Sequence, residues 1–257
     1  MAVPGPHGPL FRSRSSNDDT ALPTSGSNSV GVAPQYCGAQ RRVTNCQALV
    51  TLTLADGRVF APLGMRLFLP EVWTSNPACC ATAGIPPGQR TFVSKQHLAL
   101  LELDRVRQAG VTFGAVVADA GYGSSTAFRH GLSARGMRWA VGIASHHGVY
   151  RLDVTLAEQH KQRTGRPAKH QVPSEAARPI HEVLARLPPH HWHTVKGKEK
   201  SRWVMVRARL ADGPDISRGV RLPGEDVWVI GEKRRGGRSS TTCRTFRSGR
   251  PRPPWRG

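Results

Sequence analysis

The chain has 257 residues and a formal net charge of +20 at pH 7, from 37 Lys and Arg against 17 Asp and Glu. Hydrophobic residues make up 38% of it, and no apolar run reaches the roughly 18 residues that a membrane helix needs, so we expect a soluble protein. This charge excess favours a polyanionic partner, most commonly nucleic acid, and arginine from GC-rich coding DNA is an alternative source of it.

Several signals in the first part of the chain indicate local structure. Residues 1–16 are rich in Pro, Gly, Ser and Arg without an apolar period, and we expect them to be disordered. Between Asn45 and Leu69 two β-rich runs flank Asp56-Gly57, the strongest short signal for a hairpin of antiparallel strands. Trp73–Thr91 is dense in Pro, Ala and Gly, which predicts a loop.

Helix and strand signals then alternate. Lys95–Ala109 carries apolar residues at near-helical spacing and predicts an amphipathic helix. Phe113–Ala118 is a short apolar run typical of a buried parallel strand. Thr126–Arg135 predicts a second helix, and Trp139–Ile143 a further strand. Together with the hairpin, this order describes an α/β fold with a mixed sheet of the ribonuclease H kind.

The pattern weakens after Ser145. A basic stretch, KQRTGRPAKH, precedes a helix expected over Ser174–Leu187, and β-like runs follow at Trp203–Leu210 and Val227–Ile230. We interpret residues 17–145 as the first part of a ribonuclease H-like core and residues 146–235 as a β-rich insertion. Residues 236–257 have no apolar period and predict a disordered basic tail.

The cysteines and the first residues bear on the compartment. The N-terminal residues contain no apolar core segment of a secretory signal. The 5 cysteines are odd in number, irregularly spaced and without a Cys-x-x-Cys pair, which favours thiols over a zinc site. A reducing cytoplasm fits these features best.

Two acidic positions could carry chemistry. Asp18 and Asp19 open DDTALP, and Asp119 follows the expected buried strand directly in ADAGYG. Carboxylates at neighbouring strand ends can converge on Mg²⁺, which cuts phosphodiesters when bound between carboxylates and phosphate oxygens. The alternative is that these aspartates serve turns or cap helices.

Several blocks of the sequence occur in the order found in one family. The chain closely resembles the DDE transposase domain of bacterial insertion sequences in five blocks: DDTALPTSGSNSVGVAPQYCGAQ, NCQALVTLTLA, RLFLPEVWTSNPA, GAVVADAGYGSSTAFRHGL and ARGMRWAVGI. The resemblance is strong over residues 17–145 and continues more loosely to about residue 235.

The resemblance implies a ribonuclease H-like fold with a β-rich insertion. It makes Asp19 the first catalytic aspartate and metal ligand, with Asp18 its neighbour, and Asp119 the second. Family members use Mg²⁺ or Mn²⁺ to cut DNA at the ends of the element and join the freed 3′ ends to a target. DNA is then the partner and the bacterial nucleoid the expected place of action; the oligomeric state stays open.

The chain departs from the family pattern at three places. Phe11–Asn17 is polar where the family has an apolar strand, and we expect that it cannot pair as a central strand. The insertion lacks the family's fuller Trp, Gly and Thr-Lys-Gly pattern around HTVKGKEKSRW. The third acid, a glutamate on a helix after the insertion, has no counterpart among the 257 residues.

Other polar and aromatic residues have simpler interpretations. We expect surface charges at Glu199, Glu225 and Glu232, which lie in a loop or flank a β run. The histidines have no helical spacing typical of metal ligands and are His146, His147, His190, His191 and His193. Aromatic packing is expected for Trp139, Trp192, Trp203 and Trp228.

The tail has a specific explanation. The family continues after Glu232 with a strand resembling Tyr-Tyr-Leu-Ser-Asn-Leu-Pro, whereas this chain reads GRSSTTCRTFRSGRPRPPWRG. Ser239 through Arg247 can be encoded by TCG TCT ACT ACC TGT CGA ACC TTC CG, and reading from the third base gives Val-Tyr-Tyr-Leu-Ser-Asn-Leu-Pro. We therefore expect a frameshift near Gly236 or Gly237.

Three functional hypotheses remain from the sequence. The first is a truncated, frameshifted fragment of a transposase, encoded by a decayed gene and inactive because the third acid is missing. The second is a basic nucleic-acid-binding protein without catalysis, whose affinity falls steeply with salt. The third is an intact nuclease that recruits a different acid. Metal-dependent nicking of supercoiled DNA separates the third from the other two.

Overall fold

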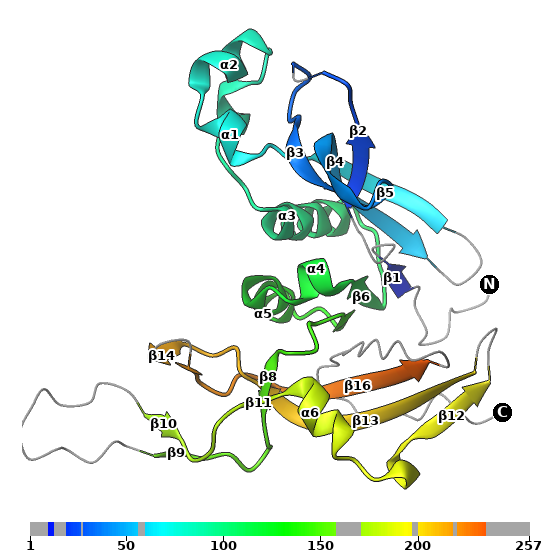
Figure 1. Ribbon diagram of the computed structural model, residues 1–257. Helices are drawn as coiled ribbons and strands as arrows, with labels where there is room; N and C mark the ends of the chain where they lie inside the picture. The colour runs from blue at the N-terminus through cyan, green and yellow to red at the C-terminus, as the bar shows by residue number, and fades with distance from the viewer. Residues whose placement is uncertain are drawn as a thin grey trace, which may run out of the picture. The chain divides into compact units, whose positions relative to one another are not determined.

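The computed structural model describes residues 10–12, 19–26, 28–55, 60–157, 171–196, 200–217 and 220–234 (Figure 1). The chain divides into two compact units, Met1–Val141 and Gly142–Gly257. The sequence placed the corresponding change at residues 145 and 146. Each unit is built on its own sheet, and the mixed α/β class expected from the sequence is confirmed.

The sheet of the first unit is organised around the long strand β4, Arg42–Ala55. Its side chains alternate between one buried face, with Ala48, Val50 and Leu52, and one partly exposed face, as expected for a strand covered on one side. The strands that pair with it antiparallel are β1 (Leu10–Arg12), β2 (Asp19–Pro23), β3 (Ala33–Cys37) and β5 (Phe60–Leu67). The predicted hairpin is confirmed as β4 and β5, and its turn at residues 56–59 lies outside the described residues.

Two further strands complete this sheet in parallel. β6, Ala115–Ala118, pairs parallel with β1 on one side and with β7, Trp139–Val141, on the other. Both strands were expected from their apolar runs, and both are shorter than predicted. Hydrogen-bonded neighbours follow the order β2, β4, β1, β6 and β7, with β3 and β5 also against β4.

The two predicted helices of this unit are confirmed. α3, Lys95–Gln108, starts where the Ser94 side chain accepts a hydrogen bond from the His97 backbone N–H, and it lies across β4 and β5 (Figure 1). α5, Thr126–Ala134, packs beside it, where the space at Gly131 lets Leu100 approach closely. Gly110 and Gly136 follow the helices with φ of 83° and 65°, values that glycine adopts without strain.

The first correction concerns Trp73–Thr91, which was predicted as a loop. This region holds α1 (Glu71–Thr74), α2 (Pro77–Thr82) and the 3₁₀ helix η1 (Pro87–Gln89). The Asn76 side chain caps α2 by accepting from the Cys79 N–H, and Pro77 suits the first helical position. Trp73 is buried and donates to the Val32 carbonyl. The high Pro and Gly content of this region indicated a loop, so the sequence did not predict these short capped helices.

A second correction concerns the N-terminal segment. The sequence predicted that residues 1–16 are disordered and that Phe11–Asn17 cannot pair as a central strand. The structure places Leu10–Arg12 as β1 between β4 and β6, in register with Leu54 and Ala55 of β4. Backbone hydrogen bonds are available to a strand whatever its side chains, so three residues pair despite their composition. Residues 13–18 lie outside the described residues.

The second unit is β-rich. Its main sheet joins β8 (Gly148–Tyr150), β11 (Arg178–Pro179), β12 (His193–Lys196), β13 (Lys200–Leu210) and β16 (Asp226–Arg234). Two small ribbons accompany it, β9 (Leu156–Ala157) with β10 (Val172–Pro173), and β14 (Asp215–Ser217) with β15 (Val220–Arg221). The basic stretch at 161–170 and the tail at 236–257 lie outside the described residues.

Helical structure in this unit is shorter than predicted. The helix expected over Ser174–Leu187 is α6, Ile180–Ala185, which begins directly after β11. A 3₁₀ turn, η2 (Pro189–His191), follows it. Leu184 of α6 packs over Gly231 of β16, where a β-carbon would lie 2.7 Å from its Cδ1 atom. Among the described helices, none is long and apolar enough to cross a membrane.

Candidate functional site

Asp119 lies directly after β6, at the carboxyl end of a buried parallel strand. Ala115, Val116 and Ala118 are all buried, so the strand is fixed within the sheet. Asp119 is partly exposed at the point where the chain leaves the sheet. Carboxyl ends of strands are where α/β sheets place their ligands, and this position is the one that the sequence predicted for the aspartate.

The carboxylate of Asp119 caps the short helix α4, Ala120–Gly123. Its Oδ1 atom accepts hydrogen bonds from the N–H groups of Gly121 at 2.8 Å and Tyr122 at 3.3 Å. A β-carbon at position 121 would lie 3.1 Å from Oδ1, so glycine lets the turn close on the carboxylate. The capping role foreseen as the alternative is thus present. It is compatible with metal binding, because one carboxylate offers about four lone-pair positions.

Aromatic and charged side chains of α4 and α5 hold the turn that carries Asp119 in place. Tyr122 is buried, with its ring centroid 5.6 Å from that of Phe128 on α5. Arg129, 1% exposed, donates to the Gly123 carbonyl at the end of α4 and to Thr126 Oγ1. The orientation of Asp119 therefore depends on the packing between α4, α5 and the sheet.

Asp19 opens β2, where its backbone pairs with Val50 of β4. Val50 also pairs with Arg66 of β5, and Leu54 pairs with both Phe11 of β1 and Ala61 of β5. Since a strand residue has one partner on each side, β1 and β2 both lie along the edge of β4 opposite to β5. Asp19 therefore lies along the same edge of β4 as β1, the strand that pairs with β6.

The strand registers connect the two aspartates through β1 and β4. Phe11 is level with Val116 of β6 and with Leu54 of β4. The pairing of β1 with β6 ends at Arg12 with Val117, and Asp119 lies two residues beyond that pair. Asp19 pairs with Val50, four residues along β4 from Leu54. The side chain of Asp19 and all of Asp18 lie outside the described residues.

A third acid does not join this pair among the described residues. No group of three or more His, Cys, Asp or Glu side chains there is arranged to hold a metal ion. The two aspartates supply the oxygen type that Mg²⁺ prefers. Glu225 is partly exposed, and Glu199 lies outside the described residues.

Glu232 requires a correction, because it was expected to be a surface charge. It is 6% exposed and forms an ion pair with Arg234, whose Nε lies 3.1 Å from Oε1. It lies opposite Trp203 in the β13–β16 ladder. This residue is on the sheet of the second unit, where it has a structural partner.

Sequence reasoning missed another buried carboxylate, Glu102 on α3. It is 1% exposed and pairs with Arg66 of β5 and with Arg105, whose Nε lies 2.8 Å from Oε2. The signal was present as a single acid within the apolar run LALLEL. Both of its cationic partners join α3 to the sheet, so Glu102 serves the packing of this unit.

The expected aromatic packing is confirmed for Trp139 and Trp192, which are buried, while Trp203 and Trp228 are partly exposed. The rings of His190 and His191 contact each other with centroids 4.5 Å apart. Neither these histidines nor the others described belong to a metal-binding group. Among the described residues, Cys37, Cys46, Cys79 and Cys80 are thiols outside any disulfide.

Comparison with known families and proteins gives one match. A family model described as DDE superfamily endonuclease matches residues 5–203, more than half of the chain. The matched segment contains Asp19 and Asp119, and it extends from the first unit to within β13 of the second. Comparison with curated proteins finds no match.

Proposed function

The chain belongs to the DDE superfamily endonucleases, and from this premise we propose that it derives from an insertion-sequence transposase and no longer cleaves DNA. The ancestral activity is divalent-metal-dependent DNA cleavage and strand transfer at the bacterial nucleoid. Asp19 and Asp119 are the retained metal ligands. The observation that supports the proposal is that Asp119 lies directly after β6, while β2, which Asp19 opens, lies along the same edge of β4 as β1, the strand that pairs with β6.

The loss of cleavage follows from the number of acidic side chains that can bind the metal ions. The 257 residues hold no glutamate in the family's third-acid pattern. Two-metal cleavage needs both ions held firmly, since one activates the nucleophile and the other stabilises the leaving oxygen. A polypeptide with two of three carboxylates loses that second function.

The test is nicking of supercoiled DNA by the purified chain in Mg²⁺ or Mn²⁺. The matched control is Asp119→Asn, which keeps an oxygen for the N–H groups of Gly121 and Tyr122 and removes the charge. We expect no difference between the two proteins. Metal-dependent nicking by the chain that is lost in Asp119→Asn would overturn the proposal and favour an intact nuclease that recruits a different acid.

A second candidate function is nucleic-acid binding without catalysis, which the net charge of +20 favours. Such binding is dominated by phosphate contacts and weakens as salt rises. We expect weak, non-specific DNA binding that drops by at least roughly tenfold between 50 and 200 mM salt. Salt-insensitive binding to one sequence would contradict this.

The tail at 236–257 enters the proposal as the product of a frameshift. The supporting observation is that the codons allowed for Ser239 through Arg247 include a set that encodes the family strand one frame away. The gene's own DNA is the test. Translating the alternative frame is expected to give that strand and then a glutamate-bearing helix, and stop codons or unrelated sequence would refute the frameshift.

A further inference from the structure

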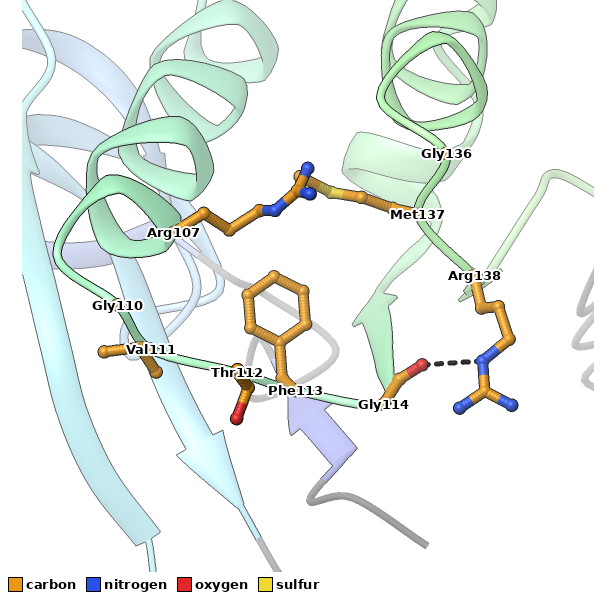
Figure 2. Close-up of a pocket in the computed structure, with 9 residues that line it drawn as sticks. All are labelled: Arg107, Gly110, Val111, Thr112, Phe113, Gly114, Gly136, Met137 and Arg138. Atoms are coloured by element: carbon orange, nitrogen blue, oxygen red, sulfur yellow. Dashed lines mark hydrogen bonds between the residues drawn. The ribbon is translucent and has the colours of Figure 1, made fainter. Parts of the chain in front are cut away.

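A pocket lies at the amino ends of β6 and β7, opposite to the end that carries Asp119. Its volume is about 470 Å³, within the range of roughly 300–1,000 Å³ common for ligand sites. The walls come from the last turn of α3, from the segment that follows α5, and from the residues that lead into the two strands (Figure 2). All lining residues lie between positions 107 and 138, within the first unit.

Two guanidinium groups give this pocket its charge. Arg107 donates from Nη1 to the Arg135 carbonyl at 3.2 Å, and Arg138 donates from Nε to the Gly114 carbonyl at 2.9 Å. Each bond orients a guanidinium group and leaves its charge in place. Among the ion pairs of the described residues, none involves Arg107 or Arg138. Two oriented cations at one pocket favour an anionic ligand.

Nearby negative charge is too small to cancel them. Asp104 is engaged by Arg135 through a bidentate ion pair, with Nη2 and Oδ2 2.7 Å apart. The carboxyl-terminal ends of α3 and α5 each carry a partial charge of about −0.5. Two full positive charges exceed their sum, so the pocket keeps a net positive potential.

An aromatic ring supplies a second type of contact. Phe113 is partly exposed, and Figure 2 shows its ring rising into the pocket between Arg107 and Arg138. A phenyl ring beside arginines is the combination on which unpaired bases stack while their phosphates meet guanidinium groups. Inside a duplex the base faces are already stacked, so a paired base cannot use this ring.

We propose that this pocket binds one unpaired nucleotide, with its base against Phe113 and its two flanking phosphates contacting Arg107 on one side of the ring and Arg138 on the other. The nucleotide belongs to a single-stranded nucleic acid, because the charge of +20 continues to attract phosphates along the rest of the strand. The choice of nucleic acid as ligand rests on the proposed function. The site itself is separate from Asp119 and does not need cleavage.

The experiment measures the affinity of the full chain for a fluorescent ten-nucleotide oligothymidylate by anisotropy. The variants are Phe113→Leu, which removes the ring and keeps apolar volume, and Arg138→Gln. Arg42→Gln is the matched control, since Arg42 is exposed, bonds a side-chain oxygen of Gln40 and lies at the far end of β4. Thermal unfolding of each variant checks that the fold is kept.

We expect Phe113→Leu and Arg138→Gln each to weaken binding roughly tenfold, which is the order of a base-stacking contact, and Arg42→Gln much less. Thymidine monophosphate is expected to compete better than inorganic phosphate, and the duplex of the same sequence is expected not to distinguish Phe113→Leu from the unchanged chain. Arg138→Lys is expected to recover part of the affinity.

Each contrary outcome points to a different failure. If the pocket variants bind the oligonucleotide as Arg42→Gln does, the pocket is not the site and only this inference fails. If inorganic phosphate competes as well as thymidine monophosphate, the base contact is refuted. If the unchanged chain binds neither single-stranded nor duplex DNA at low salt, the DNA partnership of the proposed function fails as well.

Discussion

The two ends of β6 and β7 present opposite chemistry on the same strands. At the carboxyl ends, the Asp119 carboxylate accepts two backbone N–H groups and caps α4. At the amino ends, Arg107 and Arg138 donate to backbone carbonyls beside a pocket of about 470 Å³. In both places a charged side chain uses part of its hydrogen-bonding capacity to fix its own position. The difference in sign suits the first end to cations and the second to anions.

The largest expected effect comes from a substitution on β7 that destabilises the strands carrying both ends. Trp139 of β7 is 1% exposed, and its Nε1 donates to Ser133 Oγ at 3.1 Å. We expect Trp139→Ala to lower the free energy of unfolding of the first unit by about 3–5 kcal/mol, because a large cavity opens beside β6. Urea denaturation measures this change.

The comparison for this variant is Trp228→Ala, in the second unit, where the side chain is partly exposed. It is expected to cost less, since the truncated side chain was already partly hydrated. A smaller loss for Trp139→Ala than for Trp228→Ala would show that β7 does not support the two ends in the way its burial indicates.

A smaller effect separates the two roles of Asp119. We expect Asp119→Ala to reduce the free energy of unfolding by about 1 kcal/mol, because α4 loses its cap. Asp119→Asn keeps an accepting oxygen and is expected to stay within about 0.5 kcal/mol of the unchanged chain. Equal losses in the two variants would mean that the charge, and not the cap, stabilises this turn.

The smallest effect concerns the amino ends and depends on pH. The hydrogen bond from Arg135 holds the pKa of Asp104 below its usual value of 3.8. A lowered folded-state pKa gives stability that is present above pH 3.8 and is lost as the pH falls through the folded value. Both side chains are partly exposed, so the pair is worth about 0.2–1 kcal/mol.

We therefore expect Asp104→Asn to be slightly less stable than the unchanged chain at pH 7 and to converge with it as the pH falls below 3.8. Urea titrations at several pH values measure the difference. A difference that grows on acidification would assign the loss to packing and not to the ion pair.

The sequence predicted the acid end and missed the basic end for a physical reason. Asp119 follows one continuous apolar strand, so its place at a strand end could be read from local order. Arg107 and Arg138 are thirty-one positions apart and line the same pocket because α3 packs against α5. Such a pocket has no short motif, and neither arginine lies in a pattern that differs from a solvated surface.

Other differences have similar causes. Trp73–Thr91 was predicted as a loop because its helices are only four to six residues long and depend on Asn76 and on the burial of Trp73. Leu10–Arg12 pairs in the sheet although its neighbours in sequence are polar, because pairing is a property of the backbone. The hairpin of β4 and β5 was predictable because its signal is local.

The pairing of β1 with β6 sets an order on the folding of the first unit. Leu10 of β1 pairs with Ala115 of β6, which is far away in the sequence. Ala55 of β4 pairs with Phe60 of β5, which follows only a few residues later. Short loops close at lower entropic cost than long ones, so the hairpin can form early. Residue 10 cannot find its parallel partner until residue 115 has left the ribosome. Until then the edge of β1 that pairs with β6 stands open, and this is the stage at which a nascent chain is most exposed to pairing with a foreign strand.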